Sequence, residues 1–123
     1  MDGNAGLTVL ERTVCGRPLR AEIRRMDDGI HVLLTGGDRS HIGSISWAEP
    51  GDAAHSKVFP GHRDDVLSES WAASIAHAAG VRTAVVCGVH FDNASPAVID
   101  AVVRASEEMR IELVSRICSG TES

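Results

Sequence analysis

Three clusters of glycine and histidine contain the residues of this chain best suited to chemistry. Glycine leaves peptide N–H groups uncovered and lets a ligand approach the backbone. Imidazole binds metals, contacts phosphates and carries protons near neutral pH. Each cluster falls where we expect a junction between regular elements, which predicts a binding site built from loops at one edge of a single domain. The clusters are residues 36–43, 61–65 and 88–92.

The second cluster stands immediately before an expected helix. Gly61, His62 and Arg63 would place peptide N–H groups and a guanidinium at the positive end of that helix, which is typical of a phosphate or carboxylate site. The alternative is that Asp64 caps the helix and, together with Asp65, repels an anion. The residues alone leave both interpretations open.

The other two clusters place histidines at strand ends. His41 begins an expected strand, and Gly43 follows on the same face, where a glycine marks close approach of a ligand, a bulge or a close helix contact. His90 and Asp92 follow a valine-rich segment and share a face if the strand continues. They could form an oriented histidine or a pair of metal ligands, and the alternative is a turn in which Asp92 satisfies its own backbone.

Motifs that would identify an enzyme are missing from the sequence. No HExxH, CxxC, Gly-x-Ser-x-Gly, P-loop or GxGxxG pattern occurs, so a metal is not assigned and no nucleophile stands out. The remaining histidines, His31, His55 and His77, are more typical of surface or structural positions, and we leave them out of the site.

Composition limits the class of protein. The 123 residues predict one domain over residues 7–118, with disordered tails at 1–6 and 119–123. Aromatic residues are scarce and the net charge is −5, which disfavours nucleic acid and anionic membranes as partners. Three cysteines without CxxC spacing, no signal peptide and no membrane-spanning stretch predict a cytoplasmic location.

The elements that must position the clusters follow from hydrophobic periodicity and turn residues. We expect a four-stranded antiparallel meander, a long loop over 49–60, a helix over 64–79 that stops at Gly80, and a covered strand over 82–89. Ser95 and Pro96 then start a second helix that runs to about residue 117, with a last strand over 110–117 as the alternative. The expected fold is α+β: a mainly antiparallel sheet (the meander plus one further strand) with two helices packed on one face. The meander strands are residues 7–15, 19–26, 30–35 and 41–48.

At these clusters the chain resembles the prenylated flavin chaperone LpdD-like family. Its members are small D subunits associated with gallate-type and related UbiD-like decarboxylases, and their fold is similar to that of proteasome assembly chaperones. The resemblance covers roughly residues 30–113. It implies a non-catalytic accessory protein that binds prenylated FMN, or FMN, and delivers or protects it for a UbiD-like decarboxylase.

If the chain binds such a flavin, we assign roles to the clusters as a hypothesis from their chemistry, which the resemblance itself does not decide. The second cluster would bind the flavin phosphate, histidine and serine side chains would contact the polar edge of the ring, and the glycines would let a flat ring approach the backbone. Trp47 and Phe91 are candidates to stack on it. The expected cofactor contacts are Gly37, His41, Gly43, Ser44, Gly61, His62, Arg63 and His90.

The resemblance further implies a homo-oligomer, most simply a dimer, in which clusters from two chains could complete one pocket. Two other functions stay open at this point. One is a small hydrolase or lyase that depends on a metal or on His41, His62 and His90 with Asp92. The other is a protein assembly module that binds no small ligand.

Overall fold

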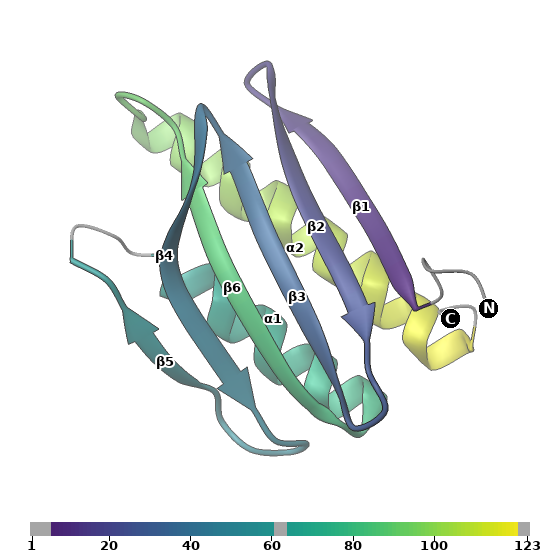
Figure 1. Cartoon of the computed structure of the whole chain (residues 1–123). Coiled ribbons are helices and arrows are strands. Elements are labelled where there is room, and N and C mark those ends of the chain that lie inside the picture. Colours follow the sequence, from purple (N-terminus) through teal and green to yellow (C-terminus); the bar gives the residue numbers. More distant parts are fainter. Residues whose placement is uncertain (1–5, 61–63, 121–123) are drawn as a thin grey trace.

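One mixed sheet with both helices on the same face makes up the described part of the chain. The computed structural model describes residues 6–60 and 64–120. The sheet has six strands in the spatial order β1-β2-β3-β6-β4-β5, and both helices lie behind it in Figure 1. The elements are β1 (Leu7–Val14), β2 (Arg17–Arg25), β3 (Gly29–Gly37), β4 (Arg39–Ala48), β5 (His55–Val58), α1 (Asp65–Ala79), β6 (Arg82–His90) and α2 (Pro96–Ser119).

The helix ends follow the local chemistry of the sequence. Gly80 ends α1 in the left-handed conformation, with φ at 70°, and its N–H bonds the carbonyl of Ala76. At the start of α2, the hydroxyl of Ser95 accepts a hydrogen bond from the N–H of Val98, and Pro96 occupies the first turn. Because α2 continues to Ser119, the alternative of a last strand over 110–117 is wrong.

The expected meander is wrong in one respect, because β6 lies between β3 and β4. It pairs parallel with β3 and antiparallel with β4, so the sheet is mixed. The chain crosses the end of β6 within residues 37–39: Gly37 and Arg39 both pair with His90, and the N–H of Asp38 bonds its carbonyl at 2.7 Å. The turn between β3 and β4 is therefore at the expected position in the sequence. It connects strands that are not neighbours, because β6 lies between them, and so it spans two strand spacings, about 10 Å.

The loop expected over 49–60 contains a short strand. β5 pairs antiparallel with β4, from Ser44 opposite Val58 to Trp47 opposite His55. Its four residues are alternately exposed and half-buried. A polar segment this short gives a weak periodic signal, since most of its stability comes from the neighbouring strand.

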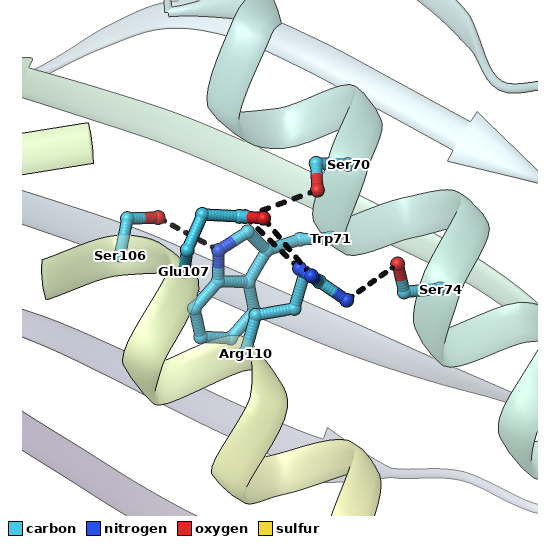
Figure 2. Close-up of polar contacts among 6 residues, drawn as sticks. All are labelled: Ser70, Trp71, Ser74, Ser106, Glu107 and Arg110. Atoms are coloured by element: carbon cyan, nitrogen blue, oxygen red, sulfur yellow. Dashed lines mark hydrogen bonds and ion pairs between the residues drawn. The ribbon is translucent and has the colours of Figure 1, made fainter. Parts of the chain in front are cut away.

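Polar contacts join the two helices above the apolar core (Figure 2). Trp71 on α1 is fully buried, and its indole N–H donates to the hydroxyl of Ser106 on α2 at 2.9 Å. Arg110 forms two hydrogen bonds with Glu107 and a third with Ser74. The hydrogen bond from Arg110 lowers the pKa of Glu107. Two of these contacts, from Trp71 to Ser106 and from Arg110 to Ser74, join α2 directly to α1.

Buried serines connect α1 to the sheet. The hydroxyl of Ser68 lies 2.8 Å from that of Ser44 and 2.6 Å from that of Ser46, and all three residues are fully buried. Small side chains let the helix approach β4 closely, and each hydroxyl has a partner, which avoids the cost of burying it alone.

Candidate functional site

The ends of five elements meet at one edge of the molecule. The crossing over β6 puts the last residues of β3 and the first of β4 beside His90. The starts of α1 and α2 lie at the same edge, because residues from both helices and from the end of β6 line one cavity. The described residues of the first and third clusters therefore lie at one edge, and that this edge is a binding site stays a prediction.

The cavity has a volume of about 370 Å³ and walls that are mostly apolar. This volume is within the range of about 300–1,000 Å³ that is typical of small-molecule sites. Only His90 and Asp64 add ionisable groups to the wall. The lining residues are Asp64, Val66, Leu67, Val89, His90, Phe91, Ala94, Val98, Ile99, Val102 and Val103.

A bulge in β4 brings His41 into contact with two residues of the cavity wall, although His41 does not itself line the cavity. Pairing with β6 shifts between Ser40 and Ser44, so that residues 41–43 lie opposite the single residue Gly88. In the bulge, Nε2 of His41 lies 3.2 Å from a carboxylate oxygen of Asp64. The rings of His41 and His90 meet edge to face, with centroids 5.9 Å apart. His41 thus stands between the two ionisable groups of the cavity wall.

His90 is oriented by a chain of polar contacts on its other side. Its Nε2 lies 2.9 Å from Oδ1 of Asp92, and the N–H of Asp92 donates to Asp38 at 2.7 Å. Arg17 donates to the other oxygen of Asp38. The hydrogen bond from the Asp92 N–H, with help from Arg17, lowers the pKa of Asp38. The contact with Asp92 therefore orients His90, which is one of the three interpretations that the sequence leaves open.

The glycines of the first and third clusters are explained by close backbone packing. A Cβ on Gly37, whose φ is +89°, would lie 2.0 Å from the carbonyl oxygen of His90. One on Gly88 would lie 1.5 Å from the carbonyl oxygen of His41, and one on Gly43 would lie 1.8 Å from the Asp64 carboxylate. Backbone carbonyl oxygens therefore require glycine at positions 37 and 88 whether or not a ligand is bound. At Gly43 the neighbour is a side chain, and the bulge and the close helix contact considered for this glycine both occur.

Among the expected cofactor contacts that the structure describes, only His90 lines the cavity, whereas Gly37, His41 and Gly43 are not part of its wall. Ser44 is fully buried against Ser68 and does not line it. Trp47 stacks on His55 instead, with ring centroids 5.8 Å apart, whereas Phe91 is part of the wall. The expected phosphate contacts of Gly61, His62 and Arg63 lie outside the described residues and stay a prediction.

Within residues 6–60 and 64–120, no three histidine, cysteine, aspartate or glutamate side chains gather in a way that could hold a metal ion. No helix in that part of the chain is long and apolar enough to cross a membrane. Cys87 on β6 is buried, and burial raises the pKa of its thiol, which disfavours the reactive thiolate.

Sequence reasoning missed the wall that α2 contributes. The expectation of two helices packed on one face of the sheet accounts for apolar residues on α2 without a cavity. The signal that could have revealed this wall is the width of the apolar surface on α2. Val98 and Ile99 are followed four residues later by Val102 and Val103, so the apolar surface is wider than packing against the sheet alone requires. Ile99 is 55% exposed and Val103 36% exposed.

The fold is an α+β domain with an apolar cavity at one edge, and comparison with known families identifies the family. The family model of the prenylated flavin chaperone LpdD-like domain matches residues 14–118. The chain belongs to this family. Membership supports a non-catalytic accessory role and confirms the resemblance noted in the sequence.

A solved structure supports the fold. A chain from the crystal structure of a novel chaperone complex for yeast 20S proteasome assembly is similar over 92% of this chain and 98% of that one, with a TM-score of 0.54 and 14% identity. At this identity the similarity concerns the fold alone. Comparison with curated proteins gives no match.

Proposed function

We propose that the chain holds prenylated FMN in the cavity at the ends of β6, α1 and α2 and passes it to a UbiD-like decarboxylase. The observation that carries this proposal is an apolar cavity of about 370 Å³ with imidazole and carboxylate groups on one side. Family membership suggests prenylated flavin as the ligand class, and the cavity is where we propose that it binds.

The chemistry of the wall matches a flavin that carries extra hydrocarbon. Val98, Val102 and Phe91 provide apolar surface for the ring system and for the prenyl-derived carbons, whose removal from water favours binding. His90 and Asp64, with His41 behind them, supply donors and acceptors for the polar edge of the ring. The phosphate would lie toward the predicted contacts of the second cluster.

The surface around the cavity fits transfer to a second protein. Val66 is 57% exposed, and with Ile99 and Val103 it leaves apolar surface at the mouth. Exposed apolar groups beside a ligand site are typical of protein contact. A decarboxylase that docks there would receive the flavin without its release into water. The chain would then act as a carrier without turnover, and as a homodimer it would carry two flavins.

Anaerobic titration of the purified protein with reduced prenylated FMN and with FMN, followed by absorbance and calorimetry, tests the proposal. We expect tighter binding of the prenylated form, because only it places the additional hydrocarbon against the wall. Ile99→Arg should weaken this binding at least tenfold by filling the mouth with charge. The matched control is Ile111→Arg, which changes a residue of the same helix that is 58% exposed and outside the cavity.

Binding that is equal in the two variants would place the ligand elsewhere on the molecule. Failure of the parent protein to bind either flavin would reduce the role to protein assembly. Stoichiometric metal that is lost in a His90→Ala variant would favour the hydrolase or lyase instead.

A further inference from the structure

Four serine hydroxyls and one carboxylate form a continuous chain of hydrogen bonds that crosses β5, β4 and α1. Ser56 on β5 donates to Glu69 on α1 at 2.5 Å, and its hydroxyl lies 2.7 Å from that of Ser46 on β4. The hydroxyl of Ser68 on α1 lies 2.6 Å from that of Ser46 and 2.8 Å from that of Ser44. Ser56 and Glu69 are half-buried, and the other three residues are fully buried. The chain of hydroxyls therefore leads from the molecular surface to the residue that follows the bulge in β4.

Glu69 determines the direction of every hydrogen bond in this chain. A carboxylate accepts hydrogen bonds and donates none, so the proton of Ser56 goes to Glu69. Each hydroxyl has a single proton, and Ser46 must therefore donate to Ser56. By the same count Ser68 donates to Ser46, and Ser44 donates to Ser68. Hydrogen bonds aligned in this way strengthen one another, and the charged acceptor makes the first of them a strong one.

The inner end of the chain belongs to a closed loop of contacts beside the cavity. The N–H of Ser68 donates to the carbonyl of Asp64 at 3.0 Å, and the carboxylate of Asp64 lies 3.2 Å from Nε2 of His41. His41 is connected back to Ser44 by the bulge, residues 41–43. Ser68 is therefore joined to both sides of the contact between Asp64 and His41, through the first turn of α1 on one side and through β4 on the other.

We propose that Ser68 and Glu69 are positioning residues for the cavity. Ser68 sets the distance between α1 and the bulged end of β4, and Glu69 fixes the direction of the hydrogen bonds on which Ser68 depends. Neither side chain lines the cavity, so both act through Asp64, which does, and through its contact with His41. The effect on ligand binding rests on the proposed function, whereas the positioning of Asp64 and His41 does not.

The spacing of residues on α1 supports this assignment. Asp64 and Ser68 are four residues apart and so lie on the same face of the helix, one turn from each other. Leu67, next to Ser68, lines the cavity together with Asp64. Apolar contact has no preferred direction, so an alanine at position 68 would pack against β4 without determining the exact position of this turn. Hydrogen bonds are directional, and the buried hydroxyls therefore give the first turns of α1 one position on β4.

The imidazole resonances of His41 in the protein without ligand provide the first test. They are assigned by their absence from the NMR spectrum of His41→Gln, and Asp64→Asn gives their position when the charged partner is lost. We expect Ser68→Ala to move the His41 resonances toward their position in Asp64→Asn, and Glu69→Gln to move them by a smaller amount in the same direction. The resonances of His31 on β3 should not move.

Ser106→Ala is the matched control. It also removes a fully buried serine hydroxyl, but this hydroxyl bonds the indole of Trp71 and not the chain on β4. The variant should lose stability as Ser68→Ala does and leave the His41 resonances in place. A merely structural role of Ser68 would make the two variants alike in the spectrum. Glu108→Gln, at an exposed position of α2, is the control for loss of a negative charge.

A double-mutant cycle tests whether Glu69 acts through the hydroxyls. Ser56→Ala separates Glu69 from the chain without changing the charge of α1. If the hydroxyls carry the effect, Glu69→Gln should add little to the shift that Ser56→Ala causes at His41. Additive shifts would mean that Glu69 acts directly by its charge, and its assignment as a positioning residue would then be wrong.

Ligand affinity is measured separately. Ser68→Ala should weaken binding of reduced prenylated FMN about fivefold, roughly the contribution of one hydrogen bond, and Ser106→Ala should leave it unchanged. If the parent protein binds no flavin, the proposed function fails and the His41 resonances still decide the positioning role. If the parent binds and Ser68→Ala binds equally well, the cavity does not depend on this positioning.

His41 resonances that stay in place in folded Ser68→Ala and Glu69→Gln would overturn the inference. So would resonances that move as far in Ser106→Ala as in Ser68→Ala. Glu69→Gln changes a half-buried side chain at the surface, so it keeps the test decisive if Ser68→Ala does not fold.

Discussion

The buried hydrogen bond between Trp71 and Ser106 should account for a measurable part of the stability of the chain. Both residues are fully buried, and the indole nitrogen lies 2.9 Å from the serine hydroxyl (Figure 2). Ser106→Ala leaves the indole N–H buried without an acceptor, which costs about 1–3 kcal/mol. Domains of this kind unfold with a free energy of about 5–15 kcal/mol, so the loss is a substantial fraction of the total.

The measurement is urea unfolding followed by circular dichroism. Replacing serine by alanine inside a helix also raises helix propensity, by up to about 0.5 kcal/mol. Ser115→Ala corrects for this gain, because Ser115 is exposed on the same helix. The difference in unfolding free energy between the two variants gives the cost of the lost hydrogen bond, and we expect at least about 1 kcal/mol.

A double-mutant cycle with Trp71→Phe identifies the cause. Phenylalanine has no N–H, so adding Ser106→Ala to that variant should cost much less than it does in the parent protein. If Ser106→Ala costs the same in both backgrounds, or if it costs no more than Ser115→Ala, then the hydrogen bond contributes nothing and the reasoning fails.

Two further predictions concern charge and close packing. Because Arg110 lowers the pKa of Glu107 in the folded state, the unfolded state binds more protons, and stability should fall as the pH drops from about 5 to 3; urea unfolding at several pH values should show a shallower fall for Glu107→Gln, and an unchanged slope would contradict the assignment. Gly88→Ala should cost about 3 kcal/mol or more, because its Cβ would lie 1.5 Å from the backbone carbonyl oxygen of His41. Gly51→Ala is the comparison, since only its left-handed φ opposes the substitution there, at about 1–2 kcal/mol; equal losses for the two variants would mean that β4 moves freely at its bulge.

Features set by local chemistry could be predicted from the sequence. Gly80 ends one helix and Ser95 with Pro96 starts the other, because a left-handed cap and a side-chain cap depend only on nearby residues. The alternation of β2 likewise reports which side chains face the core. The class of fold, with two helices on one face, follows from such elements taken together.

The order of strands could not be predicted in the same way. The segment at 82–89 was expected to be covered on both faces, but its valines do not reveal which strands stand beside it. The cavity could not be located from the sequence for a related reason. A valine such as Val102 occurs at the same helical spacing whether its side chain packs on the sheet or lines a cavity. His41 and His90 were found because glycines beside them marked irregular backbone, whereas the role of Asp64 depends on a contact between elements that are 23 residues apart.

The position of β6 in the sheet has a consequence for synthesis of the protein. Residues 82–90 are made last among the strands, yet they fill the gap between β3 and β4. Until they leave the ribosome, these two strands each keep an edge of unpaired N–H and C=O groups, which is a template for aggregation. Nascent chains that stop before residue 82 therefore cannot complete the sheet, and a chaperone protein of this kind should itself depend on protection during its own translation.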